Sequence, residues 1–132
     1  MKKRIYIAGP MRGHRDFNYA AFYEAEKMLT ALGWDVENPA RISDKFGSQE
    51  EIAKSFLFKD ADPTSVPLEC GMRQYIYDKG RLARKLVAYE LGVVASCDAI
   101  FLLDGWNISN GAREELRVAL EHNLEVVLEE NT

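Results

Sequence analysis

Two adjacent glutamates, Glu114 and Glu115, stand where a loop rich in glycine and asparagine gives way to an amphipathic stretch. Acidic residues in a first helical turn ordinarily serve only to stabilise the helix dipole, so geometry must separate the two. The helix predicted over 112–123 has four apolar residues on one face: Ala112, Leu116, Ala119 and Leu120. At about 100° per residue, Glu115 lies on the shoulder of this face and Glu114 points away from it. We therefore expect Glu115 to look into a cleft and Glu114 to be solvated.

A third glutamate, Glu90, falls inside the apolar arc of a second predicted helix, Arg81–Ala95. The arc is made of Leu82, Ala83, Leu86, Val87, Tyr89, Leu91, Val93 and Val94. A carboxylate in such a place must be paired, hydrogen-bonded or protonated, because burial of a lone charge is prohibitive. A buried ion pair with Arg73 or Arg84 is the structural alternative to a role in a site.

These two carboxyl groups, Glu115 and Glu90, occupy dissimilar settings. Glu115 is expected to be ionised near a helix N-terminus, whereas apolar neighbours are expected to raise the pKa of Glu90. One ionised and one protonated carboxyl group are typical of sites that cleave glycosidic bonds, where the first attacks the sugar carbon and the second assists the leaving group.

The turn Gly9–Asp16 holds the residues that could bind an anion. It matches neither GxGxxG nor a Walker A sequence, which removes the main support for a dinucleotide or nucleoside-triphosphate site. Arg12 and Arg15 stand among glycines before a predicted helix, where a guanidinium and backbone amides can hold a phosphate. A surface or structural role for Arg12 is the alternative.

The order of predicted elements indicates an α/β fold. A β-branched run at Arg4–Gly9 and a stretch at Trp34–Pro39 predict two strands, separated by a helix that Asp16 or Asn18 could cap and that Gly33 ends. Further strands are predicted at Asp98–Asp104 and Glu125–Glu130. We expect one doubly wound parallel sheet, Rossmann-like or flavodoxin-like, of about five strands flanked by helices, with ligands at the carboxyl ends of the strands.

Length and composition are those of one globular domain, which we expect to span residues 1–132. A formal charge of −4 excludes a global basic field for nucleic acid. Cys70, Cys97, His14 and His122 match no metal-binding spacing, so we expect no metal, no cofactor and a reduced, cytoplasmic protein. No targeting or membrane segment is predicted.

The stretch from Ala40 to Gly80 is less regular. Phe46–Phe58 is compatible with a helix, whereas Asp60–Gly71 carries two prolines. A long irregular excursion inside a domain is more often functional or partner-contacting than incidental, with disorder as the alternative.

The segments "IYIAGPMRG", "CDAIFLLDG" and "SNGAREE" together resemble the nucleoside 2-deoxyribosyltransferase superfamily, in particular its deoxynucleoside 5′-monophosphate N-glycosidase branch. The likeness covers roughly the first 40 and last 45 residues. It implies that Glu115, four residues after Gly111, is the nucleophile that attacks C1′ of the sugar. Glu90, eight residues before Asp98, takes the place of an aspartate that serves as general acid or orients the base.

The resemblance also implies a substrate. Ser109 stands where nucleoside transferases have an aspartate and monophosphate hydrolases a serine, and a hydroxyl can donate to a phosphate that an aspartate would repel. Arg12 and Gly13 match the first loop of the hydrolases. Three more positions resemble sugar-binding or loop-shaping residues: Tyr6, Gly9 and Asp104.

We therefore expect an enzyme that hydrolyses the N-glycosidic bond of (deoxy)nucleoside 5′-monophosphates through a covalent glycosyl-glutamate. Base exchange between nucleosides and a non-catalytic nucleotide-binding or regulatory module remain alternatives. The expected partner is the small-molecule nucleotide, without nucleic acid or membrane. The resemblance implies a homodimer or higher homo-oligomer.

Overall fold

The protein is described by a computed structural model that covers residues 2–11, 15–62, 64 and 72–129. Its sheet has four parallel strands in the order β2-β1-β3-β4. They are β1 (Arg4–Ala8), β2 (Asp35–Glu37), β3 (Ala99–Leu102) and β4 (Glu125–Leu128). The predicted α/β class and parallel flavodoxin-like sheet are confirmed, with four strands in the described residues rather than about five.

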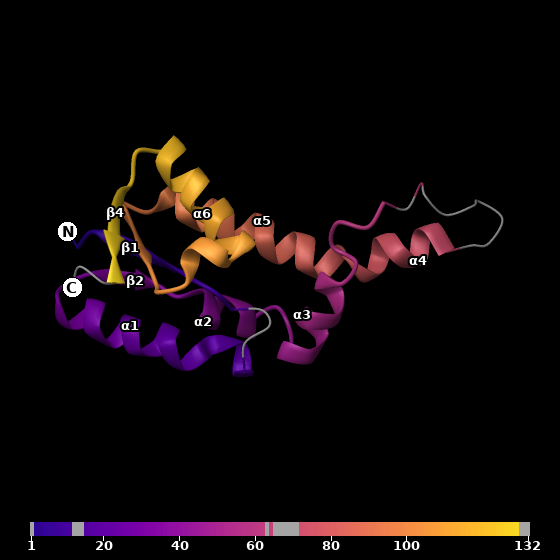
Figure 1. Cartoon of the computed structure of the whole chain (residues 1–132), viewed down its shortest axis with the longest axis horizontal. Helices are drawn as coiled ribbons and strands as arrows, with labels where there is room; N and C mark the ends of the chain where they lie inside the picture. The colour runs from indigo at the N-terminus through magenta and orange to yellow at the C-terminus, as the bar shows by residue number, and fades with distance from the viewer. Residues whose placement is uncertain (1, 12–14, 63, 65–71, 130–132) are drawn as a thin grey trace. The chain divides into compact units, whose positions relative to one another are not determined.

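Helices connect and flank the strands. They are α1 (Tyr19–Ala31), α2 (Pro39–Asp44), α3 (Gln49–Phe56), α4 (Met72–Lys79), α5 (Arg81–Ser96) and α6 (Asn110–Glu121), with 3-10 turns η1 (Arg15–Asn18) and η4 (Trp106–Ile108). α1 covers one face of the sheet and α6 the other (Figure 1). α2 and α4 formed where the sequence predicted no regular element.

The start of α1 differs from the prediction. Asn18 is its N-cap, but the Asn18 side chain makes no capping bond and donates instead to the carbonyl of Pro10 at 2.9 Å. Asp16, Phe17 and Asn18 all have positive φ, a left-handed turn that places the cap side chain away from the helix. The predicted stop is confirmed, because Gly33 adopts φ 98° directly after the last turn.

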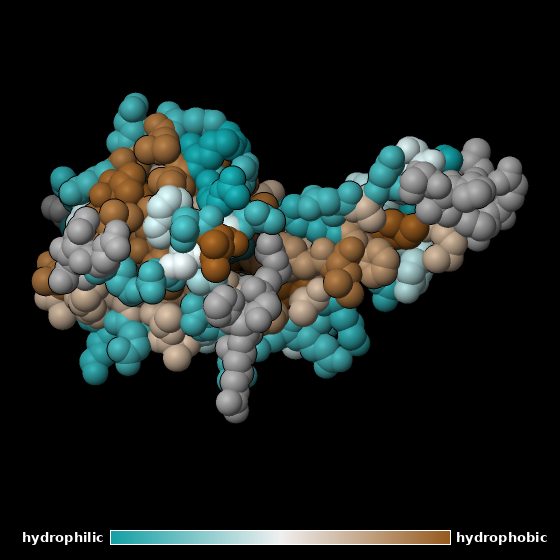
Figure 2. All heavy atoms as spheres, in the orientation of Figure 1, coloured by the Kyte–Doolittle hydropathy of each residue, from teal (hydrophilic) through white to brown (hydrophobic). Residues whose placement is uncertain are grey.

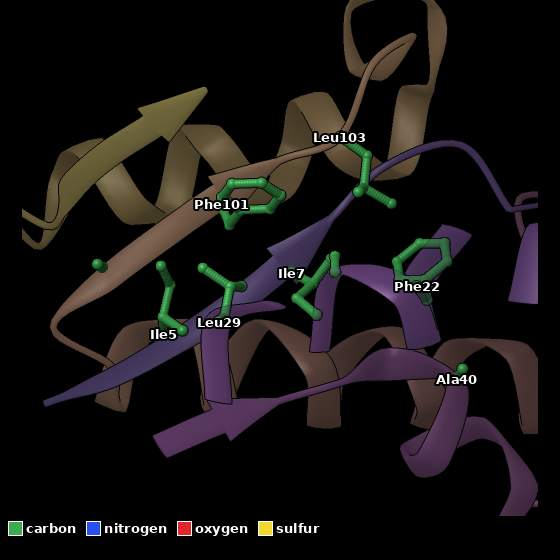
Figure 3. Packing of buried hydrophobic residues seen from close by; sticks show 9 residues of the cluster. Ile5, Ile7, Phe22, Leu29, Ala40, Phe101 and Leu103 are labelled. Carbon is green, nitrogen blue, oxygen red and sulfur yellow. The ribbon is translucent and has the colours of Figure 1, made fainter. Parts of the chain in front are cut away.

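The sheet is apolar on the face that α1 covers. Side chains alternate along β1, so Ile5 and Ile7 point to the same side. Figure 3 shows them packed with Phe101 of β3 and with Phe22 and Leu29 of α1, all buried. Because β1 and β3 are central strands, their residues are buried on both faces, which explains the nearly continuous apolar runs of their sequences.

The strand order places a topological switch point between β1 and β3. From β1 the chain goes to β2 on one side, and β3 and β4 lie on the other. All carboxyl ends meet at one edge of the sheet, since the strands are parallel. In open α/β sheets the crevice at this point is the preferred place for a ligand.

The chain divides into two compact units: residues 1–42 with 90–132, which hold the sheet, and residues 43–89. The expectation of a single domain stays a prediction. In the second unit, α3 begins with a capping box in which Ser48 and Glu51 bond each other's backbone amides. In the described residues, no helix has both the length and the apolar character needed to span a bilayer.

Candidate active site

Tyr6 of β1 lies at the centre of the candidate site. Its ring is fully buried on the face of the sheet opposite Ile5 and Ile7. Its hydroxyl is hydrogen-bonded to Glu90 Oε2 at 3.1 Å and to Glu115 Oε2. The structure therefore brings together three residues that the sequence analysis named separately, from a strand and two helices.

Glu115 is placed by the way α6 begins and packs. Ser109 caps the helix, its Oγ accepting the Ala112 amide at 3.2 Å. The buried residues of the helix are Ala112, Val118 and Ala119. At about 100° per residue these centre on Glu115, so this side chain lies on the buried face itself rather than on its shoulder.

The predicted face of α6 is wrong in one respect, since Leu120 is 58% exposed. The neighbouring strand β4 is the last of the sheet, and its Val126 is also exposed, so this flank of the helix has no strand to cover it. Glu114 lies on the outer side as expected, paired with Arg117 in the same helix. Although the two glutamates are adjacent, Glu114 forms an exposed ion pair with Arg117, whereas Glu115 is hydrogen-bonded to the buried phenol of Tyr6.

Glu90 is half-buried on α5. The predicted apolar arc is confirmed at Leu86 and Val94, which are buried, but it is wrong at Tyr89, which is 53% exposed. A stripe assigned from apolarity alone placed the amphipathic Tyr89 inward, although a tyrosine can keep its polar end in water. The bond to Tyr6 gives the Glu90 carboxyl a hydrogen-bonding partner inside the protein.

The shared phenol limits the distance between the two carboxyl groups. Each has an oxygen within hydrogen-bond distance of one atom, Tyr6 Oη, so these two oxygens are no more than about 6 Å apart. A phenol has a single proton and can donate to only one carboxylate. The two carboxyl groups therefore share one donor hydroxyl.

Tyr6 itself stays protonated. Burial raises the pKa of its phenol well above the usual range, and the negative charges of Glu115 and Glu90 raise it further. The phenol is therefore a permanent hydrogen-bond donor at neutral pH.

The loop between β3 and α6 begins at the carboxyl edge of the sheet, where β3 ends. Asp104 is exposed, and its backbone amide donates to Glu129 Oε1 at 3.1 Å. Gly105 has φ 87°, and a Cβ there would lie 3.3 Å from Pro10 Cγ. Ser109 Oγ accepts the capping hydrogen bond, and the hydroxyl proton of Ser109 can still be donated to a ligand.

The glycines among the predicted residues differ in what they do. A Cβ on Gly9 would lie 2.7 Å from Leu103 Cβ, so Gly9 is required by the close approach of the chain after β1 to the end of β3. Gly111 is partly buried in the first turn of α6. Arg12 and Gly13 lie outside the described residues, as does His14.

Glu129 is a further residue at the candidate site that the sequence pattern did not indicate. This residue follows β4 and fixes the first amide of the site loop, but a glutamate after an edge strand carries no distinguishing pattern. Only the pairing of β4 with β3, which sets their ends side by side, could have indicated it. Among the described residues, no three histidine, cysteine or acidic side chains are grouped so as to hold a metal ion.

An open depression lies at the other end of the strands, lined by Lys2, Lys3, Leu32, Gly33 and Trp34. These residues precede β1 and β2 or follow α1, so the depression is at the amino edge of the sheet. It shares no residue with the Tyr6 cluster.

The sequence matches one family model over nearly all of this architecture. The family is described as a domain of unknown function (DUF4406), and the match covers residues 3–59 and 73–128. The matched stretches contain all four strands and the residues Tyr6, Glu90 and Glu115. No curated protein matches the chain.

Proposed function

We propose that this chain, which belongs to the DUF4406 family, hydrolyses the N-glycosidic bond of (deoxy)nucleoside 5′-monophosphates. The observation that carries the proposal is the buried Tyr6 hydroxyl bonded to two carboxyl groups at the switch point of a parallel sheet. Paired carboxyl groups in unlike settings are the usual means of cleaving glycosidic bonds.

The two glutamates have different roles in the proposal. Glu115 is the sixth residue of α6 rather than a residue of its first turn, and Glu90 is the tenth residue of α5, so neither lies in the terminal turn where the helix dipole acts. The roles are therefore taken from the resemblance, which makes Glu115 the nucleophile and Glu90 the general acid.

The reaction has two displacements. The Glu115 carboxylate attacks C1′ while the bond from C1′ to the base nitrogen breaks, and Glu90 supplies the proton that the departing base requires. Water then attacks C1′ of the glycosyl ester, Glu90 accepts its proton, and the Glu115 carboxylate is released. Tyr6 donates a hydrogen bond to the carboxylate and holds it in position.

The short distance between the carboxyl groups supports a covalent intermediate. Enzymes that retain configuration have carboxyl groups about 5–5.5 Å apart, whereas inverting enzymes leave about 6.5–9.5 Å for a water. The shared phenol keeps the nearest oxygens of the two groups within about 6 Å of each other, which is compatible with the shorter spacing.

The preference for a monophosphate rests on the start of α6. Ser109 offers a hydroxyl proton there, and the helix N-terminus offers a positive dipole end. The resemblance to the monophosphate N-glycosidase branch assigns Arg12 as the cation that binds the phosphate. An aspartate in place of Ser109 would repel the phosphate.

The resemblance to the nucleoside 2-deoxyribosyltransferase superfamily supports the same chemistry and leaves one alternative reaction, base exchange. In base exchange, a second base instead of water would attack the glycosyl-enzyme, from the same Glu115 intermediate. A non-catalytic nucleotide-binding module is the rival from another class.

A panel of deoxy- and ribonucleoside 5′-monophosphates, analysed by chromatography for free base, tests the proposal. We expect base release from at least one monophosphate, slower release from the matching nucleoside, and none with Glu115→Gln. Release that requires an added acceptor base would assign exchange instead. Nucleotide binding without release, equal in wild type and Glu115→Gln, would assign the binding module.

A further inference from the structure

Arg113 is a cation without a partner in the helix that carries Glu115. It is the fourth residue of α6 and exposed, and its backbone amide donates to the carbonyl of Ser109 at 3.0 Å. Its guanidinium has no hydrogen bond, ion pair or ring contact within the part of the chain that the structure describes. Each of the other arginines with a described side chain has such a partner: Arg4, Arg41, Arg73, Arg81, Arg84 and Arg117.

The surroundings of Arg113 within α6 oppose its charge. It lies at the end of the first helical turn, where the helix dipole disfavours a cation, and that turn holds no acidic residue. Four positions further on is Arg117, and like charges at this spacing repel each other. The glutamates of the outer side, Glu114 and Glu121, pair with Arg117. Arg113 therefore carries a positive charge that a bound anion would neutralise.

A conflict with the local rules of a helix is expected where a residue serves a ligand instead of the fold. Solvent can reach this side of the helix, since Figure 2 shows hydrophilic side chains gathered over α6. An anion in solution can therefore approach the Arg113 guanidinium.

The position of Arg113 around the helix keeps it apart from the proposed nucleophile. At about 100° per residue, Arg113 and Glu115 lie about 160° apart around the axis of α6. A guanidinium beside the Glu115 carboxylate would stabilise its negative charge and so weaken it as a nucleophile. A cation on the far side of the same helix does not have this effect.

The same geometry directs Arg113 toward the start of α6. Between Ser109 and Arg113 the helix turns by about 40° and rises by about 6 Å. Long side chains in a helix lean toward its N-terminus, so the guanidinium can extend along α6 toward the Ser109 hydroxyl. That hydroxyl keeps its proton for a ligand, because its oxygen accepts the Ala112 amide. One anion at the start of the helix can thus bind both groups.

We propose that Arg113 binds the 5′-phosphate of the substrate together with Ser109, and so makes the enzyme prefer a nucleoside monophosphate to a nucleoside. The inference rests on the proposed function, and it adds a second cation to Arg12. A guanidinium gives two parallel hydrogen bonds to phosphate oxygens, which a neutral side chain cannot do. Because the phosphate does not take part in bond breaking at C1′, Arg113 acts on KM more than on kcat.

Base release by Arg113→Gln tests this role. With the monophosphate that wild type hydrolyses fastest, we expect KM to rise about 10–100-fold, as for lost hydrogen bonds to a charged group. The ratio of kcat/KM for this monophosphate to kcat/KM for its nucleoside should fall by a similar factor, because the nucleoside has no phosphate. Arg113→Lys keeps the charge without the paired donors and should recover part of the preference.

Arg117→Gln is the matched control. It removes an arginine one turn further along the same helix that already pairs with Glu114 and Glu121. Exposed pairs of this kind contribute little, so the preference for the monophosphate and the thermal transition should both stay at the wild-type values. The thermal transition of Arg113→Gln should not fall either, since the helix dipole and Arg117 both disfavour a cation at position 113.

A binding measurement without turnover separates this inference from the catalytic one. In Glu115→Gln protein, 2-deoxyribose 5-phosphate is titrated by isothermal calorimetry, with 2-deoxyribose as the reference that has no phosphate. Adding Arg113→Gln should raise the Kd of the sugar phosphate about tenfold or more. Such a loss in a protein that releases no base would contradict the hydrolase and still support the role of Arg113.

Three results would overturn the inference. One is a wild type that hydrolyses monophosphates with the same KM and the same preference as Arg113→Gln. Another is an equal loss in Arg113→Gln and Arg117→Gln, which would assign the effect to the net charge of the helix. The third is a wild type that neither releases base nor binds 2-deoxyribose 5-phosphate, which would overturn the proposed function as well.

Discussion

The two faces of the sheet are built from alternate residues of the same strands, yet they bury different chemistry. On the α1 face, Ile5 and Ile7 meet Phe22 and Phe101 in an apolar cluster. On the opposite face, Tyr6 meets Glu90 and Glu115. A buried phenol could be satisfied by one backbone carbonyl, whereas two carboxyl groups in its place are costly to desolvate. The first face maintains the fold, and we propose that the second carries the chemistry.

The largest effect on the Tyr6 face is expected when the proposed nucleophile is removed. Glu115→Gln keeps the size of the side chain but cannot form a glycosyl ester, so we expect kcat/KM for base release to fall at least about a thousandfold. Glu114→Gln is the matched control, since Glu114 lies on the outer side of the helix in an exposed pair with Arg117, and it should stay within about threefold of wild type. Equal losses in the two variants, measured by base release, would remove the distinction between the glutamates.

The opposite face should respond in stability and not in chemistry. Phe22→Ala empties a fully buried position of the apolar cluster, and we expect the free energy of unfolding to fall by about 3–5 kcal/mol in urea titrations. The folded variant should retain the wild-type kcat. Leu32→Ala at the exposed end of α1 is the control and should change stability by less than about 0.5 kcal/mol. A Phe22→Ala protein that is stable but inactive would contradict the division between the faces.

Removing only the Tyr6 hydroxyl gives a smaller effect. Tyr6→Phe keeps the buried ring but leaves the two carboxyl groups without their shared partner. Hydrogen bonds to charged groups contribute about 1.5–3 kcal/mol, so kcat/KM should fall about 10–100-fold, mainly in kcat. Steady-state kinetics of base release provide the measurement, and an unchanged kcat would show that Tyr6 only fills space.

The smallest expected effect is a dependence of stability on alkaline pH. The pKa of folded Tyr6 is raised well above the ordinary value of 10, so the unfolded phenol ionises first and the free energy of unfolding declines as pH rises above about 10. Burial also raises the pKa of the Cys97 thiol to about 11, which adds a decline between about pH 9 and 11. Urea titrations from pH 8 to 11 should show a shallower decline for Tyr6→Phe than for wild type, and identical slopes would contradict the assignment to Tyr6.

The sheet and its order of elements could be predicted because the responsible patterns are local. Each pattern spans only a few consecutive residues: the buried apolar runs of β1 and β3, and the glycine that ends α1. The helices α2 and α4 were not predicted, since both are short and α4 buries nothing. Their existence depends on neighbours that the sequence pattern does not reveal.

The residues that meet in the candidate site were named from the sequence, but their arrangement could be predicted less well. Glu115 and Glu90 were identified from their positions on helices. The helix wheel of α6 wrongly placed Leu120 inward, because a wheel does not show where the sheet ends, and that of α5 wrongly placed Tyr89 inward, because apolarity alone does not account for its polar hydroxyl. The sharing of one phenol between both glutamates could not be predicted, since it depends on how α5 and α6 cross β1. The contact of Glu129 with the site loop depends in the same way on the pairing of β4 with β3.

The most direct test of the central claim is to trap the sugar on the enzyme. A 2′-fluoro-2′-deoxynucleoside 5′-monophosphate slows hydrolysis of the glycosyl ester, and trypsin then releases the short peptide Glu114–Arg117 between two arginines. Fragmentation by mass spectrometry should place the sugar phosphate on Glu115 and find none in Glu115→Gln. An adduct on Glu90, or base release from this substrate with no adduct on Glu115, would contradict the account.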